Sequence, residues 1–309
     1  MATLGEMQSL IADIDKPFET LRDHYINGVP PGISTGWRGF DDYFLFTPEG
    51  QLNVVTGAPS AGKSEWVNSL SINMMISHGW RTLVYSPETH PLEFHLRILC
   101  EKLTGKHFSG EYSGHQKMTM EELTMCQAVL KENFVAINAE TGISTVDAIL
   151  KAILFESRAK RINMAVIDPW NKLEVFRPKG ISSTEYIGQS LTKIQIFARK
   201  YGISFWVVAH PAKPMKKKDG TYPEFTLYDV ADSAHFYNMI DNGFIFTRDR
   251  QAKRSGNGIV KCSVEKIKNR LYGKEGDHYF EFDRRCAKFH DALPPQEEPE
   301  EVSKDSWHD

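Results

Sequence analysis

One segment, Gly57-Ala58-Pro59-Ser60-Ala61-Gly62-Lys63-Ser64, constrains this chain more than any other. It follows the apolar run 52–56 and precedes a stretch of helical spacing, 64–78, so a strand, a loop and a helix follow one another. Glycines let such a loop wrap tightly, and successive backbone N–H groups then point at phosphate oxygens. The segment therefore predicts a nucleotide phosphate site formed by residues 57–64.

Two side chains in this motif carry chemistry of their own. Lys63 is expected to reach the β and γ phosphates, and the Ser64 hydroxyl is expected to bind Mg²⁺. A magnesium nucleotide also needs an acid at the end of a nearby strand. The strand 163–167 ends at Asp168, which parallel pairing would place at the same sheet edge as the loop. A strand ending in Asp is weak evidence alone, but beside this motif Asp168 is predicted to hold the magnesium ion with Ser64.

Hydrolysis requires a group that orients or deprotonates water. Glu88 follows the strand 82–86 and would project from the sheet edge that carries Asp168. This position suits a general base. The alternative is a glutamate that only stabilises the N-terminus of the next helix through the helix dipole.

Apolar runs rich in β-forming residues alternate with helical stretches from residue 33 to 290. This alternation predicts an α/β fold with a mostly parallel sheet and helices on both faces. The runs 258–265 and 278–283 are separated by turns and are expected to form antiparallel strands at one sheet edge. The expected strands are 52–56, 82–86, 133–138, 163–167, 203–209 and 243–247, and the expected helices are 64–78, 91–103, 120–131, 145–158 and 185–200.

Composition excludes several protein classes. The 309 residues are 41% hydrophobic and 25% charged, with a formal net charge of −3, so any nucleic-acid site must be a local basic patch. No run approaches the ~20 apolar residues that span a membrane, and no signal peptide is recognisable. The four cysteines form no Cys-x-x-Cys pair, which favours a reduced cytoplasmic setting and makes zinc an unexpected ligand.

The two ends of the chain differ from the central segment, 33–291. Apolar residues at helical spacing predict a lone helix over 4–28, within an N-terminal linker segment 1–32 that ends in a Pro/Gly breaker. This helix packs either on its own domain or on a neighbouring subunit. The last segment, 292–309, is acidic and rich in proline, so it is predicted to be a disordered solubilising tail or a partner-binding tail with Trp307 as its anchor.

The order of motifs resembles the motor domain of DnaB-type hexameric replicative helicases, in the branch with mitochondrial Twinkle and the phage primase-helicases. The resemblance covers about residues 20 to 290 and implies a RecA-like P-loop ATPase core. It is carried by the P-loop, Glu88, Ile167-Asp168-Pro169-Trp170-Asn171, Trp206-Val207-Val208-Ala209-His210-Pro211, Asp232-Ser233-Ala234 and Lys268-Asn269-Arg270. The histidine-proline pair and the late Lys-x-Arg are its most specific parts.

The resemblance implies roles for further residues. His210 would sense the γ-phosphate and relay its loss to a DNA-binding loop, although a structural histidine is the alternative. Lys268 and Arg270 would project into the active site of the next subunit as a cationic finger. Arg248 and Phe282 would sandwich the nucleotide base.

The densest basic cluster of the chain follows His210 and contains Lys213, Lys216, Lys217 and Lys218. Lysines on a loop suit sequence-independent phosphate binding. In the resembled family such loops line the central channel of a ring. We therefore expect single-stranded DNA here, with a solvated surface loop as the alternative and a second channel loop around 177–180.

Together these features predict a ring-forming helicase that uses ATP or another NTP with Mg²⁺ and moves 5′ to 3′ on single-stranded DNA. A hexamer or heptamer is expected, in the cytoplasm of a bacterial or phage-infected cell. About thirty residues precede the core, so either the motor stands alone or a primase is supplied by another chain. A separate primase or polymerase is the partner that the acidic tail would contact. The alternatives are a RecA-like ATPase that remodels DNA without unwinding it and an ATP-locked loader or scaffold.

Overall fold

The computed structural model describes residues 11–109, 116–141, 145–173, 180–211, 226–230, 235–248 and 258–294. In these ranges it contains a nine-stranded sheet with strand order β3-β2-β4-β5-β1-β6-β7-β8-β9. The first six strands of this order are parallel, and the last three are antiparallel at one edge. The α/β RecA-like fold and its antiparallel edge are thereby confirmed.

The strands coincide with the predicted apolar runs to within a few residues. β9 is the exception, because its mostly polar sequence gave no strand signal. The bounds are β1 Gln51–Gly57, β2 Thr82–Tyr85, β3 Phe134–Ala136, β4 Met164–Ile167, β5 Ser204–Val208, β6 Asn242–Thr247, β7 Ile259–Ile267, β8 Gly276–Asp283 and β9 Lys288–Ala292.

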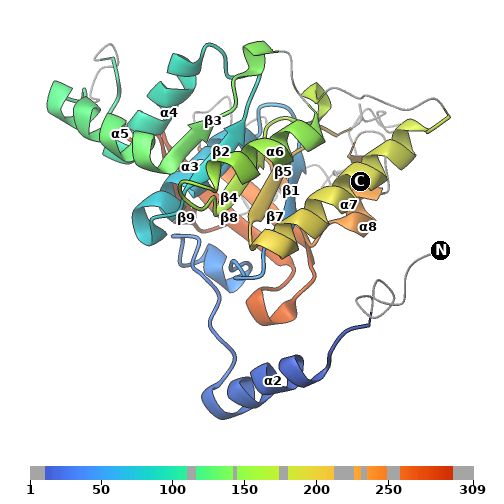
Figure 1. Cartoon of the computed structure of the whole chain (residues 1–309). Helices are drawn as coiled ribbons and strands as arrows, with labels where there is room; N and C mark the ends of the chain where they lie inside the picture. The colour runs from blue at the N-terminus through green and yellow to red at the C-terminus, as the bar shows by residue number, and fades with distance from the viewer. Residues whose placement is uncertain are drawn as a thin grey trace, which may run out of the picture.

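Side chains of the central strands alternate between two cores. In β5, Phe205 and Val207 join the core formed with helices α6 and α7, whereas Trp206 and Val208 join an aromatic core with Trp66 of helix α3. A strand buried on both faces reads as a continuous apolar run, which explains why these strands were recognisable in the sequence. The two cores place helices on both faces of the sheet (Figure 1).

Three of the helices, α5, α6 and α7, begin where a side chain caps them. Thr119 and Glu122 form a capping box at α5, and the hydroxyls of Thr145 and Ser182 accept backbone N–H groups at α6 and α7. Within the described ranges, none of the helices combines the length and apolarity that crossing a membrane would require. The α-helices are α2 Asp15–Asn27, α3 Lys63–His78, α4 Leu92–Thr104, α5 Met120–Asn133, α6 Val146–Glu156, α7 Ser183–Tyr201 and α8 His235–Met239.

Helix α2 stands apart from the sheet domain (Figure 1). None of its side chains is buried, and Phe18 and Leu21 are 52% and 57% exposed. The predicted helix 4–28 is too long at its start, because residues 11–14 are not helical and Asp15 begins the helix; residues 1–10 lie outside the described ranges. In this chain the apolar stripe of α2 is uncovered.

Candidate nucleotide site

The P-loop connects the end of β1 to the start of α3, as the sequence predicts. β1 is buried along its whole length between β5 and β6. Gly57 ends it with φ +130°, and a Cβ there would lie 2.1 Å from the carbonyl oxygen of Phe246 in β6. Only glycine fits this approach, so the neighbouring strand fixes the point at which the chain turns into the loop.

Lys63 folds back over the loop that precedes it. Its Nζ donates hydrogen bonds to the carbonyl oxygens of Gly57 and Ala58, at 2.8 and 2.9 Å. The side chain is buried, and this burial lowers the pKa of Lys63 to about 8, against the opposing effect of Asp168. A cationic side chain therefore lies at the mouth of the phosphate loop.

Asp168 directly follows β4 and is only 8% exposed. Its backbone N–H donates to the carbonyl of Tyr85 at 2.9 Å, which anchors it between the ends of β4 and β2. Burial raises the pKa of Asp168 to about 6; Glu88 adds to the rise, whereas a hydrogen bond from Ser64 and the charge of Lys63 oppose it. A buried carboxylate next to a hydroxyl offers the hard oxygen donors that Mg²⁺ prefers, so Ser64 and Asp168 fit the predicted metal role.

Glu88 and His210 follow β2 and β5, at the same edge of the sheet. Glu88 is half exposed and forms an ion pair of 3.6 Å with Lys172. Burial lowers the pKa of His210, and nearby Lys63 lowers it further, while Glu88 opposes the shift. The charges of Lys63 and Glu88 affect the pKa values of both Asp168 and His210, so the four side chains lie close to one another. Lys172 was not among the residues predicted for this site, because a lysine a few residues after a strand carries no recognisable signal in the sequence.

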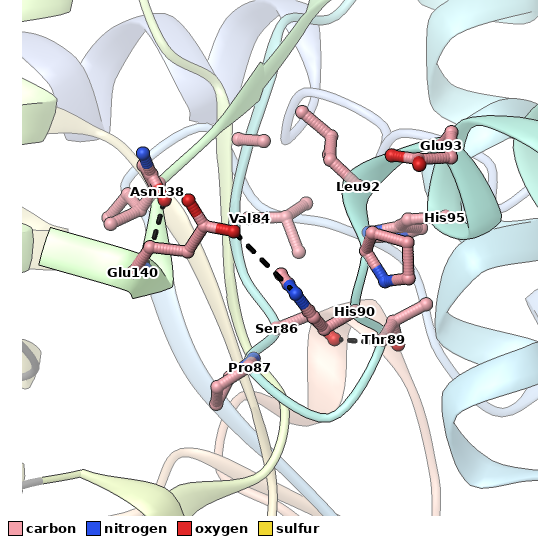
Figure 2. A pocket seen from close by; sticks show the side chains of 13 residues that line it. Val84, Ser86, Pro87, Thr89, His90, Leu92, Glu93, His95, Asn138 and Glu140 are labelled. Atoms are coloured by element: carbon pink, nitrogen blue, oxygen red, sulfur yellow. Dashed lines mark hydrogen bonds and ion pairs between the residues drawn. The ribbon is translucent and has the colours of Figure 1, made fainter. Parts of the chain in front are cut away.

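The loop that carries Glu88 also lines a cavity of ≈300 Å³ at the carboxyl ends of β2 and β3 and the start of α4 (Figure 2). His90 on this loop faces Glu140 across the cavity at 3.6 Å, and Ser86 and Thr89 share a hydrogen bond of 3.0 Å. Glu88 itself does not line the cavity. These contacts hold the loop on both sides of Glu88, whose side chain stays half exposed.

Residues 32–291 match the family described as DnaB-like helicase C terminal domain. The chain belongs to this family. The resemblance seen in the sequence is thus confirmed, and membership implies a nucleotide-hydrolysing motor domain that uses Mg²⁺.

Individual relatives agree with this assignment. The chain is 35% identical over 269 residues to the Twinkle homolog protein, chloroplastic/mitochondrial, of Arabidopsis thaliana, an alignment that covers 86% of this chain and 37% of that protein. A solved ATPase domain of another protein is 16% identical, with a TM-score of 0.74, 92% of this chain and 100% of that chain covered. The structure of a DnaB-like replicative helicase, solved in a study of its interactions with primase, gives a TM-score of 0.72 at 16% identity. The match covers 94% of this chain and 70% of that chain.

In this DnaB-like domain a second cavity, of ≈660 Å³, adjoins the P-loop at Gly62. Arg248, which follows β6, and Phe282 of β8 both line it. Phe282 also packs on Phe289, with ring centroids 5.0 Å apart. The structure thus brings together the two residues predicted to sandwich the base, in a cavity of suitable position and size.

Lys268 and Arg270 lie at the edge of the sheet where the parallel strands begin, opposite to the edge where they end and where the P-loop lies. β7 is antiparallel to β6, and its last residue, Ile267, pairs with Asn242, the first residue of β6. Both cations follow Ile267 and are exposed, whereas the P-loop follows the other end of the sheet. Neither cation is placed to reach the phosphate loop of its own chain.

A buried carboxylate organises that opposite edge. Asp241 accepts the backbone N–H of Leu52 in β1 at 3.0 Å and pairs with Arg199 at 2.7 Å and Lys268 at 3.2 Å. Lys268 therefore has an intramolecular partner, whereas no ion pair of Arg270 is found within the described part of the chain. The Lys-x-Arg motif alone could not show this difference.

Several predicted residues fall outside the described ranges. They are the lysines at 213, 216, 217 and 218, the second loop 177–179, the segment 232–234 and the tail from 295 onward. Their predicted roles in binding DNA and partners remain predictions.

Proposed function

We propose that this chain is the motor of a ring-shaped replicative helicase that hydrolyses ATP or another NTP and moves 5′ to 3′ on single-stranded DNA. The proposal rests on how the structure separates two sets of residues. One edge of the sheet carries Lys63, Asp168, Glu88 and His210, and the opposite edge carries Lys268 and Arg270. A site that needs both sets is complete only when a second copy supplies the cations. Head-to-tail contacts of this kind generate a ring when the rotation between neighbouring copies closes.

The carboxyl edge would carry out hydrolysis. Lys63 would exchange its two carbonyl partners for the β and γ phosphates, and the loop N–H groups would bind the remaining phosphate oxygens. Ser64 and Asp168 would hold Mg²⁺, which neutralises charge that develops on the phosphates. Glu88 would accept a proton from the attacking water, and its ion pair with Lys172 would orient the carboxylate before the reaction.

Coupling to DNA would begin at His210. This residue lies on the shared edge, is electrostatically linked to Lys63 and Glu88, and directly precedes the lysine-rich segment that contains Lys213, Lys216, Lys217 and Lys218. Loss of the γ-phosphate at the edge would change the position of His210 and hence of that segment. This relay and the direction of movement rest on the family resemblance.

Partner contacts would come from the ends of the chain. The uncovered apolar stripe of α2 fits a neighbouring subunit of a hexamer or heptamer, because an exposed helix of this kind gains stability only by docking. A primase or polymerase on another chain would contact the acidic segment 292–309. The chain spans 37% of the length of its Twinkle-like relative, so the activities of that whole protein remain proposals for this one.

Forked DNA substrates test the proposal. We expect ATP-dependent strand displacement on a fork with a 5′ loading tail, no displacement from a 3′ tail alone, and none with Lys63→Ala. DNA-stimulated hydrolysis without displacement would favour the remodelling ATPase. Absence of DNA-stimulated hydrolysis would favour the scaffold and overturn the motor assignment.

A further inference from the structure

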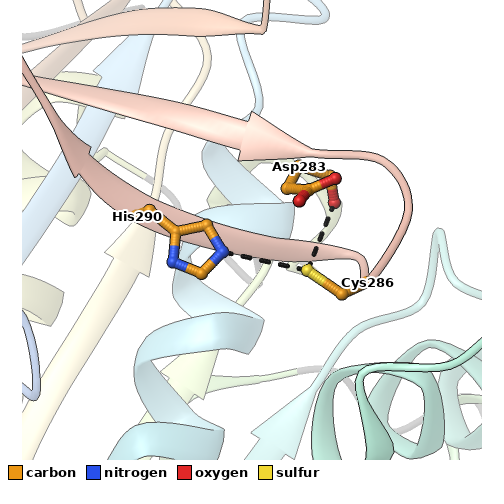
Figure 3. Close-up of side chains that lie close together, drawn as sticks. All are labelled: Asp283, Cys286 and His290. Carbon is orange, nitrogen blue, oxygen red and sulfur yellow. Dashed lines mark hydrogen bonds between the residues drawn. The ribbon is translucent and has the colours of Figure 1, made fainter.

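The β8–β9 hairpin gathers three metal-binding side chains at its turn. Asp283 is the last residue of β8, Cys286 lies in the turn, and His290 is on β9. Their ligand atoms all lie within 4.8 Å of one another (Figure 3). This cluster takes no part in the nucleotide site described above.

The pairing of β8 with β9 determines which side chains of the hairpin lie together. In the hairpin Phe282 pairs with Phe289, and both join the aromatic core on one face. Because side chains alternate along a strand, Asp283 and His290 lie on the opposite face. Ala287 adopts a left-handed φ of 54°, which allows the short turn between the strands.

The turn is also fixed from outside the hairpin. Lys102 of α4 donates a hydrogen bond of 2.8 Å to the carbonyl of Ala287, and a ring nitrogen of His107 lies 2.6 Å from the carbonyl of Arg284. Contacts with α4 and its following loop therefore hold the turn at both of its ends. A ligand at the turn would meet side chains that are already close together, which lowers the entropy lost on binding.

The spacing suits a tetrahedral metal. Cys286 Sγ and His290 Nε2 are 3.8 Å apart. Zinc–sulfur and zinc–nitrogen bonds of ordinary length at a tetrahedral angle put these two atoms about 3.5 Å apart. A thiolate, an imidazole and a carboxylate select Zn²⁺ and similar transition metals over Mg²⁺ or Ca²⁺.

We propose that Asp283, Cys286 and His290 form a binding site for one Zn²⁺ ion, with a fourth position open to water or a partner's ligand. The absence of a Cys-x-x-Cys pair pointed away from zinc, but a site with a single cysteine does not need that pattern. The ≈660 Å³ cavity beside the P-loop is lined by Phe282 and Phe289, on the other face of the hairpin from Asp283 and His290.

Arg285 competes for one of the ligands. Its guanidinium binds Asp283 through Nη2 and Nε, at 2.8 and 3.0 Å, and holds the pKa of that carboxyl well below its usual range. The metal must displace this exposed guanidinium before the carboxylate can bind it. Removing the guanidinium should therefore strengthen metal binding rather than weaken it.

Titration of the full nucleotide-free chain with Co²⁺, under non-thiol reducing conditions, tests the proposal. We expect one equivalent to produce a thiolate-to-cobalt charge-transfer band, with Zn²⁺ displacing the cobalt. Cobalt at Ser64 and Asp168 would give no such band, so this result is independent of the nucleotide site. Cys286→Ser should abolish the band, whereas the matched variant Cys126→Ser, on α5, should keep it.

Two further variants complete the test. His290→Ala should weaken the affinity by at least the roughly 10- to 100-fold that loss of an outer-shell partner costs, because His290 is a direct ligand. Arg285→Ala should raise the affinity several-fold, and as an exposed side chain it should leave the fold intact. A missing band in the wild-type chain, or a band that persists in Cys286→Ser, would overturn the proposal. Unchanged or weaker binding in Arg285→Ala would exclude Asp283 as a ligand.

Discussion

The environment of Asp168 conflicts with the charge of its side chain, because the carboxyl group is buried. Burial raises its folded-state pKa to about 6, from 3.8. Below both values the carboxyl is protonated in the folded and the unfolded chain alike. As the pH rises past 3.8 the unfolded chain loses its proton first, so stability falls until the pH exceeds about 6.

Asp168→Asn should remove this pH-dependent loss of folding stability, because asparagine does not ionise. By the size of the pKa shift, the variant should gain on the order of 3 kcal/mol relative to wild type between about pH 4 and pH 7. Denaturant unfolding of both chains across this range, without nucleotide or metal, measures the difference. The exposed Asp147→Asn is the matched control. A constant difference across the range would contradict the burial of an ionisable Asp168.

Glu88→Gln should separate binding from hydrolysis. The amide keeps the shape of the side chain but cannot accept a proton from water, so turnover should fall about 100-fold or more while nucleotide affinity changes little. Single-turnover hydrolysis and nucleotide titration measure the two effects. Glu93→Gln, also exposed and at the start of α4, should behave like wild type. Wild-type turnover in Glu88→Gln would leave Glu88 with only a structural role.

The residues of the carboxyl edge could be predicted because each follows a buried strand. Asp168 and Glu88 needed only the strand runs and the rule that parallel strands end at one edge, whereas His210 was named from the family resemblance. Lys172 could not be predicted, since its ion pair with Glu88 depends on how two loops approach each other. The link between Lys268 and Asp241 likewise joins segments whose proximity only the strand order reveals.

At the scale of elements, α2 carries the clearest prediction. Phe18→Ser combined with Leu21→Ser should reduce assembly, because these exposed side chains form the stripe proposed to dock on a neighbour. Glu19→Ser combined with Arg22→Ser changes adjacent positions on the same helix and should leave assembly unchanged. Light scattering after size exclusion, with nucleotide present, gives the masses. Equal masses for both double variants would mean that α2 does not join subunits.

Most elements were predictable because burial on both faces of the central strands leaves long apolar runs. Strand β9 and the start of helix α2 could not be predicted. β9 alternates polar side chains with Phe289 and is stabilised by pairing with β8, which a scan for apolar runs misses. Residues 11–14 continue the helical spacing of α2 but are not helical, because spacing alone does not fix where a helix begins.

For the whole molecule, we propose that two copies share each active site. The P-loop and Arg270 lie at opposite edges of the sheet, so one chain cannot bring them together. Arg270→Ala should therefore bind nucleotide normally and lose DNA-stimulated hydrolysis, by about 10³-fold or more if the arginine acts as such fingers do elsewhere. Lys63→Ala should be inactive through loss of phosphate contacts.

Mixing these two inactive variants is the most direct test of that claim. In rings assembled from equal amounts, about one interface in four joins an intact Lys63 on one subunit to an intact Arg270 on the next. DNA-stimulated ATPase activity should reappear on mixing, at up to about a quarter of the wild-type rate. If both residues acted within one chain, every site would carry a defect. Subunits that are shown to co-assemble and yet recover no activity would contradict the shared site.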